Sequence, residues 1–190
     1  MSDKIIRKIA VIFVTDVVSF SKLMERDEDQ TLQSFRACKS ILDNLFEEHS
    51  GRIFNTAGDS VLAEFPSAVS AVICAAEFQK LVKERNASVE PLAEMHFRVG
   101  LNMGDVIVEG NNLYGDGVNV AARLEALSQP DGVCLSKSIH DFVSQKVDLA
   151  FKDLGDQKVK NTIVHAFDMT LEGMAVRELK QTESDVKSDG

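Results

Sequence analysis

The order of apolar patterns along the chain constrains its fold more than any other feature. Residues 9–18 form an apolar run rich in β-branched side chains, which predicts a buried central strand. Apolar side chains at helical spacing follow and stop before Gly51, which predicts a helix. The elements predicted for the first half are a strand at 9–18, a helix at 28–49, a hairpin of strands 52–56 and 60–65, and a helix that begins at Pro66.

The second half of the chain continues this alternation. We expect a hairpin with strands at 96–102 and 106–109 that turns at 103–105, and then a turn-rich loop at 111–117. The remaining predicted elements are a helix at 118–127, a strand at 133–135, a helix at 138–143, and closing strands around Phe151 and at 165–170. Polar side chains dominate from residue 172 onward, so we predict one domain over residues 1–170 and a polar tail or linker over 171–190.

This order of elements is typical of a split βαβ arrangement. A right-handed crossover leaves a gap between the first two parallel strands, and the strand of residues 60–65 can fill it antiparallel to the first. The predicted fold class is therefore α/β, more closely α+β. It has a ferredoxin-like split βαβ core, a mostly antiparallel sheet flanked by helices, and a C-terminal β/α extension.

Two acidic residues, Asp16 and Asp59, are expected to meet at one edge of this sheet. Asp16 ends the first apolar run, and Asp59 lies in the turn between the strands of the first hairpin. A desolvated carboxylate is costly without a partner, and a second acid nearby raises the cost. Paired carboxylates suit a hard cation such as Mg²⁺ that also binds a triphosphate. The alternative is that both are solvated turn residues.

Composition excludes several classes of partner. The net charge is −9, and a surface for nucleic acid or anionic membrane would need a basic footprint instead. The three cysteines are widely spaced and predict core thiols rather than disulfides or a zinc site. No signal peptide or membrane-spanning run is recognisable, so we expect a cytoplasmic protein.

Three further polar residues are candidates for substrate contacts. Asn119 and Arg123 are four residues apart at the start of a predicted helix and therefore share one face. An amide can orient a sugar, and a guanidinium can bind phosphate oxygens. The alternative is a surface arginine that pairs with Glu125 or caps the helix. Lys160 is a candidate point charge for phosphate, although a single lysine is more often solvated.

Four segments together resemble the catalytic domain of the class III nucleotidyl cyclases. They are residues 13–21 (FVTDVVSFS), 55–65 (NTAGDSVLAEF), 98–104 (RVGLNMG) and 114–123 (YGDGVNVAAR). The resemblance covers about residues 8–170, in order and with suitable spacing. It is closest to bacterial adenylate and guanylate cyclase domains, which cyclise a nucleoside triphosphate and release pyrophosphate.

The resemblance implies a role for each candidate residue. Asp16 and Asp59 are expected to hold two Mg²⁺ or Mn²⁺ ions, one at the ribose 3′-hydroxyl and one at the triphosphate. Asn119 matches the ribose-orienting residue, Arg123 the transition-state arginine, and Lys160 the lysine at the triphosphate. The backbone groups expected along the phosphates are those of Val17, Val18, Ser19 and Phe20.

The sequence departs from the family pattern at the base. Adenylate cyclases typically carry Lys where this chain has Asn55, and Asp or Thr where it has Asn112. Guanylate cyclases favour Glu and a small residue such as Cys. An Asn amide both donates and accepts, so this pair can face adenine, guanine or a pyrimidine. Asp105 stands where many relatives place a phosphate-binding arginine.

These observations lead to one principal interpretation and two rivals. The principal one is a homodimer that converts ATP to 3′,5′-cyclic AMP. The resemblance implies shared active sites, with the metal-binding acids from one chain and Asn119, Arg123 and the base contacts from the other. One rival is a cyclase for GTP or a pyrimidine nucleotide. The other is a non-catalytic regulatory or dimerisation module that keeps the fold, for which Asn55 and Asn112 are the evidence.

Overall fold

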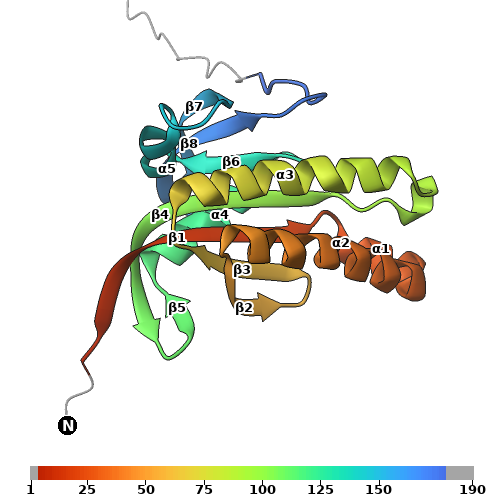
Figure 1. Ribbon diagram of the computed structural model, residues 1–190, viewed down its shortest axis with the longest axis horizontal. Helices are drawn as coiled ribbons and strands as arrows, with labels where there is room; N and C mark the ends of the chain where they lie inside the picture. Colours follow the sequence, from red (N-terminus) through yellow and green to blue (C-terminus); the bar gives the residue numbers. More distant parts are fainter. Residues whose placement is uncertain (1–3, 179–190) are drawn as a thin grey trace, which may run out of the picture.

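The structure, a computed structural model, describes residues 4–178 and contains one eight-stranded sheet (Figure 1). The strands are β1 (Ile6–Val17), β2 (Arg52–Ala57), β3 (Ser60–Phe65), β4 (Phe97–Glu109), β5 (Asn112–Tyr114), β6 (Val133–Ser136), β7 (Ala150–Val159) and β8 (Thr162–Thr170). The α-helices are α1 (Phe20–Arg26), α2 (Glu28–His49), α3 (Ala68–Ala87), α4 (Asp116–Leu127) and α5 (Lys137–Val143), and η1 (Pro91–Ala93) is a 3₁₀ turn.

The strand order confirms the predicted split βαβ core. It runs β2-β3-β1-β4-β6-β8-β7, with β5 paired to β4. Strand β3 lies between β2 and β1 and is antiparallel to both, so it fills the gap that the first crossover leaves. Only the β4–β6 pair is parallel among the described strands, which makes the sheet mostly antiparallel. The predicted fold class is therefore correct.

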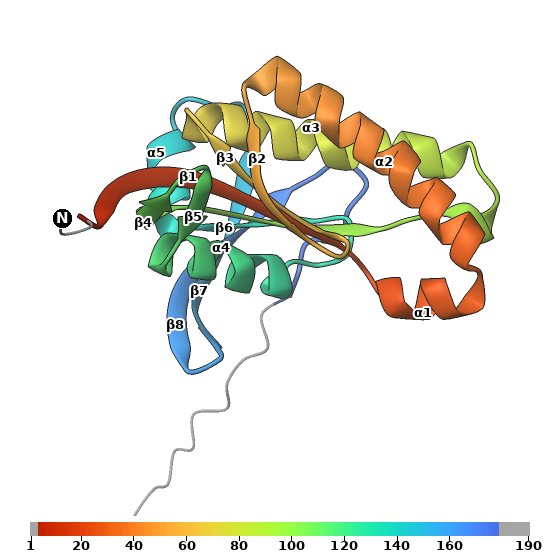
Figure 2. The same cartoon turned by 90° about the horizontal axis from the view of Figure 1, so that it is seen from below.

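Helices cover both faces of the sheet, as Figure 2 shows, with α2 and α3 on one face and α4 on the other. The larger apolar core lies under α2 and α3. At its centre the rings of Phe13, Phe46 and Phe65 contact one another at centroid distances of 5.2 to 5.7 Å, which joins β1, α2 and β3. A smaller cluster that includes Ile12 and Ala121 lies between the sheet and α4.

Hydrogen-bonded caps set the starts of the two long helices. Asp27 accepts a hydrogen bond from the Gln30 amide at the start of α2. Ser67 does the same for the Ser70 amide at the start of α3, so this helix begins two residues after the predicted Pro66. Helix α1, between β1 and α2, was not predicted.

The predicted hairpin that turns at residues 103–105 is wrong. Strand β4 runs without interruption from Phe97 to Glu109 and pairs with β1 from Phe97 to Val108. The turn lies further on, where Gly110 has a φ of 59° and β4 pairs with the short strand β5. Gly104 serves packing instead, because a Cβ there would lie 3.2 Å from Asn102 Nδ2 and 3.4 Å from Gly117 Cα.

The predicted domain boundary at residue 170 falls at the end of β8. Residues 171–178 continue from that strand, and the rest of the predicted tail, 179–190, lies outside the described residues. In the part of the chain that the structure describes, no helix is long and apolar enough to cross a membrane.

Candidate active site

Asp16 and Asp59 meet at one edge of the sheet, as the topology predicts. The β1–β3 register pairs Thr15 with Val61, so the end of β1 lies beside the turn that precedes β3. Asp59 Oδ2 accepts a hydrogen bond of 2.8 Å from the Val17 amide, the residue directly after Asp16. The turn itself uses Gly58 with a φ of 59°.

A third acid, Glu125 of α4, lies beside this pair. Its side chain is buried, with 7% of the residue exposed. Burial raises the pKa of Glu125 to about 9, and a hydrogen bond with Asp16, together with the negative charges of Asp16 and Asp59, adds to the shift. A pKa near 9 keeps Glu125 protonated at neutral pH when no metal is bound, because negative charge is crowded at this edge of the sheet. This is the charge environment that a divalent cation would relieve.

Glycine at position 100 lets α4 approach the sheet closely enough to place Glu125 there. A Cβ on Gly100 would lie 2.2 Å from the Glu125 backbone nitrogen and 2.4 Å from the Ala121 carbonyl oxygen. Gly117, in the first turn of α4, is equally confined, since its Cβ would lie 2.7 Å from the Asp105 carbonyl oxygen. The two glycines fix the helix against β4.

Arg98 supplies the positive charge beside the acids. It lies opposite Asp16 in the β1–β4 register, and its charge lowers the pKa of Glu125 against the larger effect of burial. Its Nε donates to the Ser128 carbonyl oxygen at 3.0 Å, directly after α4. Arg98 lies in the motif of residues 98–104, but the sequence alone predicts no role for it.

Glu125 was also missed, because it was considered only as a surface partner of Arg123. The structure gives no Arg123–Glu125 ion pair within residues 4–178, so that alternative is wrong for this pair. The helical pattern contained the signal, since Glu125 falls on the same helix face as the buried residues Val118 and Ala121.

The backbone after Asp16 is already held by hydrogen bonds. The Val17 amide donates to Asp59, and the Val18 amide donates to the His96 carbonyl oxygen at 2.8 Å. Ser19 then adopts a left-handed conformation with a φ of 57° and precedes α1. Of the backbone N–H groups predicted to lie along the phosphates, those of Val17 and Val18 therefore already have acceptors. A phosphate contact is expected from those of Ser19 and Phe20 instead.

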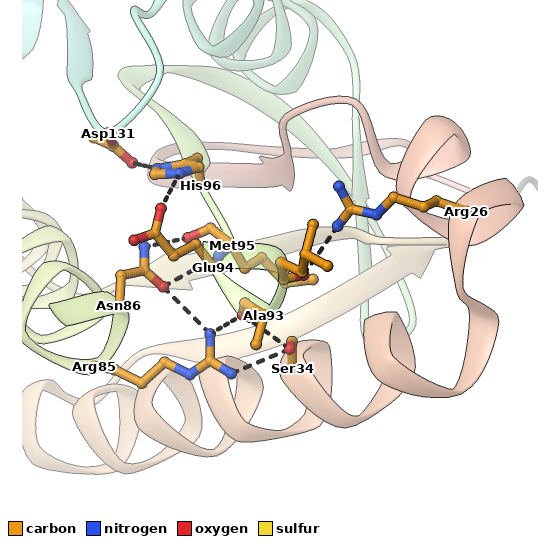
Figure 3. A network of polar contacts seen from close by, with 10 residues as sticks. Arg26, Ser34, Arg85, Asn86, Ala93, Glu94, Met95, His96 and Asp131 are labelled. Carbon is orange, nitrogen blue, oxygen red and sulfur yellow. Dashed lines mark hydrogen bonds and ion pairs between the residues drawn. The ribbon is translucent and has the colours of Figure 1, made fainter. Parts of the chain in front are cut away.

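A polar network fixes the connection that precedes β4 and hence the position of His96 (Figure 3). Asn86 Nδ2 donates to the Met95 carbonyl oxygen at 2.8 Å, and the Met95 amide donates to Asn86 Oδ1 at 3.1 Å. His96 Nδ1 lies 2.7 Å from Asp131 Oδ1, in the turn after α4. The other labelled members of the network are Arg26, Ser34, Arg85, Ala93 and Glu94. Through His96, this scaffold supports the loop that follows Asp16.

Asn119, Arg123 and Lys160 gather at a separate pocket on α4. Its volume is about 170 Å³, and its lining residues are Asn119, Ala122, Arg123, Ala126, Val159 and Lys160. Lys160 reaches it from the β7–β8 turn, where Lys160 and Asn161 have φ values of 47° and 63°. The structure thus brings the three predicted residues together. It does not join them to the acids, because Glu125 faces the sheet and Asn119 is exposed on another side of the helix.

The two asparagines predicted to read the base lie on β2 and β5. Asn55 is exposed on β2, just after an irregularity in the β2–β3 pairing. The Asn112 side-chain carbonyl oxygen accepts from the Leu113 amide at 2.9 Å, and its Nδ2 donates to the Tyr114 hydroxyl at 3.1 Å. A backbone amide can only donate, so the orientation of the Asn112 amide follows from this contact.

Comparison with known proteins identifies the family. Residues 1–173 match the adenylate and guanylate cyclase catalytic domain. The chain belongs to this family. A Rhizobium meliloti protein named as a putative adenylate cyclase is 46% identical over 160 residues, which are 84% of this chain and 27% of that protein. This chain therefore spans about a quarter of that relative's length.

Solved structures of cyclase domains share the fold. An adenylate/guanylate cyclase/hydrolase from Silicibacter pomeroyi has a TM-score of 0.81 and 34% identity, and the match covers 87% of this chain and 98% of that one. The adenylyl cyclase CyaB from P. aeruginosa has a TM-score of 0.75 at 21% identity and covers 93% of this chain and 100% of its own. The second likeness supports the fold alone.

A cyclase-family domain needs a group that can hold divalent cations, and the carboxylates of Asp16 and Asp59 have the right chemistry. Both are oxygen ligands, and the raised pKa of neighbouring Glu125, which their negative charges help to produce, is consistent with a site that suits a cation. Another group, Glu48, His49 and Glu77, has ligand atoms within 4.8 Å of one another between α2 and α3. A hydrogen bond of 3.0 Å between His49 Nε2 and Glu77 Oε2 accounts for the proximity of these side chains.

Proposed function

We propose that this domain is a metal-dependent nucleotidyl cyclase that converts ATP to 3′,5′-cyclic AMP and pyrophosphate. The observation that carries the proposal is the meeting of Asp16 and Asp59 at one sheet edge, with the buried side chain of Glu125 beside them. Family membership supports it, as does the adenylate cyclase name of the R. meliloti relative.

In the proposed reaction the ribose 3′-hydroxyl attacks the α-phosphorus. The new O3′–P bond forms, the bond from the α-phosphorus to the oxygen that bridges to the β-phosphate breaks, and pyrophosphate leaves with that oxygen. The 3′-hydroxyl proton is lost to solvent. Mg²⁺ or Mn²⁺ bound by Asp16 and Asp59 would lower the pKa of the 3′-hydroxyl and neutralise negative charge on the triphosphate. The protein holds the attacking 3′-oxygen, the α-phosphorus and the leaving oxygen in line.

The side chains of the α4 pocket have complementary roles. The Asn119 amide orients the ribose, and the Arg123 guanidinium stabilises charge that develops on the phosphate oxygens in the transition state. Lys160 offers a point charge to the terminal phosphates. Arg98 adds a positive charge on the side of the acids.

We further propose that two chains share each active site. Within one chain α4 separates the acids on its sheet-facing side from the pocket of Asn119 and Arg123. A two-fold dimer can bring the acids of one chain opposite the pocket of its partner, and an isologous interface then creates two equivalent sites. A lone chain is expected to be inactive.

Base selectivity is proposed to be modest. The Asn112 side-chain carbonyl oxygen already accepts from the Leu113 amide, so one of its lone pairs is used before a base arrives. Neutral amides at Asn55 and Asn112 reject a wrong base less strongly than a lysine and a carboxylate would. Turnover of GTP, and of the pyrimidine nucleotides to a smaller extent, is therefore expected beside that of ATP.

The decisive experiment is product analysis with ATP, GTP, UTP and CTP in turn, with Mn²⁺. Cyclic nucleotide and pyrophosphate should appear in equal amounts, most with ATP, and Asp59→Ala should give neither. A folded, dimeric wild-type protein that forms no cyclic product from any of the four would support the regulatory module instead. A clear preference for another base would move the assignment to that nucleotide.

A further inference from the structure

The segment after the last strand returns to the end of helix α4. Arg177 Nη2 donates to the Leu127 carbonyl oxygen at 2.7 Å, and Leu127 is the last residue of α4. The same nitrogen lies 3.1 Å from Asp168 Oδ1, and Arg177 Nε lies 2.9 Å from Asp168 Oδ2. Residue 177 thus joins strand β8 to the helix that carries Asn119 and Arg123.

The contact satisfies a group that a helix leaves without a partner. The last carbonyl groups of an α-helix have no intrahelical donor, and a cation there also interacts favourably with the helix dipole. In α4 the Leu127 carbonyl receives Arg177, and the next carbonyl, that of Ser128, receives Arg98. Two arginines from separate parts of the chain therefore hold the same end of this helix.

The pair with Asp168 makes Arg177 a fixed donor rather than a mobile surface side chain. The side chains of Arg177 and Asp168 are only 24% and 14% exposed. Asp168 itself is held in the sheet, where it pairs with Cys134 of β6 and Lys152 of β7. Nη2 carries two N–H groups, so with one directed at this rigid carboxylate the other has a defined direction, toward the Leu127 carbonyl oxygen.

We propose that Arg177 is a positioning residue for α4 that acts through the Leu127 carbonyl. It fixes the end of the helix and so the placement of Asn119 and Arg123 toward a substrate. Residues 171–178, after β8, are then a functional part of the domain. The catalytic consequence rests on the proposed function, whereas the effect on the helix does not.

The chain offers a matched control for this contact. Lys83 Nζ of α3 donates to the Glu172 carbonyl oxygen at 3.3 Å and so holds the same segment to a different helix. Lys83→Gln removes the cation of α3 that contacts Glu172, and Arg177→Gln removes the cation of the segment that contacts α4. Only Arg177→Gln removes the guanidinium that donates to the Leu127 carbonyl oxygen at the end of α4.

Hydrogen exchange of the full chain tests the helix directly. Peptides that cover residues 116–128 should exchange several-fold faster in Arg177→Gln than in wild type, while a peptide from β1 is unchanged. Lys83→Gln should leave both peptides at the wild-type rate, and Arg177→Lys should give an intermediate rate in α4. Equal exchange of α4 in wild type and Arg177→Gln, or equal acceleration of α4 and β1, would overturn the proposal.

Kinetics test the functional part. In Arg177→Gln, kcat should fall about tenfold or more with a smaller change in KM, because Asn119 and Arg123 are misplaced rather than removed. Arg177→Lys should recover part of kcat, and Lys83→Gln should match wild type. An unchanged kcat in an active protein would refute the link to catalysis. A wild type without cyclase activity would instead refute the proposed function, and the exchange data would still decide the role of Arg177.

Discussion

Replacement of Glu125 by glutamine should make the metal-free protein more stable at neutral and alkaline pH. The ordinary pKa of a glutamate is 4.5, and burial beside Asp16 raises that of Glu125 to about 9. Between these values the folded protein keeps a proton that the unfolded chain has lost. The free energy of unfolding must then fall as pH rises, by about 1.4 kcal/mol for each pH unit.

The size of the effect follows from this pH window. From pH 5.5 to 8.5 the wild type should lose up to about 4 kcal/mol of unfolding free energy through this site. In the Glu125→Gln variant the new side chain would carry no charge in either state, and its amide can donate to Asp16. The variant should therefore show a flatter pH dependence and exceed wild type in stability at neutral and alkaline pH.

Urea denaturation in EDTA at several pH values measures this difference. The exposed residue Glu109 provides a control, since the unfolding free energy of Glu109→Gln should vary with pH as that of wild type does. If wild type and Glu125→Gln gave parallel curves, Glu125 would not hold a proton in the folded state. The account of an acid-crowded site at the sheet edge would then fail.

Three further predictions concern the site and its supports. Asp59→Ala should lose nearly all Mn²⁺-dependent turnover yet remain folded, because it removes a metal ligand and also relieves repulsion between acids; full activity with Mg²⁺ would exclude this site. Gly100→Ala should lower stability by about 1–3 kcal/mol and reduce turnover, measured by thermal unfolding and kinetics, because its Cβ would meet the Glu125 backbone nitrogen at 2.2 Å. Asn55→Lys combined with Asn112→Asp should raise ATP turnover relative to GTP turnover, and an unchanged ratio would show that these residues do not read the base.

The meeting of Asp16 and Asp59 could be predicted from the sequence because it depends on topology alone. A strand, a helix and a hairpin in that order leave one gap, and filling the gap places the end of β1 beside the β2–β3 turn. The local residue types determine those elements. No tertiary detail is needed to predict that the two acids are neighbours.

The errors arise where packing overrides local signals. Gly104 followed by an acid suggests a turn, but the pairing of β4 with β1 keeps the strand extended, and the glycine admits Gly117 of α4 instead. The positions of Glu125 and Arg98 beside the acids depend on how closely α4 packs on the sheet, and Gly100 permits that close packing. Arg177 lies in a stretch predicted to be a polar tail, because a polar composition does not indicate a specific contact such as the one with the Leu127 carbonyl oxygen.

The most direct test of the central claim, a site shared between two chains, is to mix two inactive variants. Asp59→Ala and Arg123→Ala should each be inactive as homodimers. After subunit exchange, a mixed dimer has one site with both defects and one intact site. Random pairing makes about half of the dimers mixed, so activity should recover to roughly a quarter of wild type. No recovery despite verified exchange would show that each chain builds its own site, and would contradict the shared active site proposed for this cyclase domain.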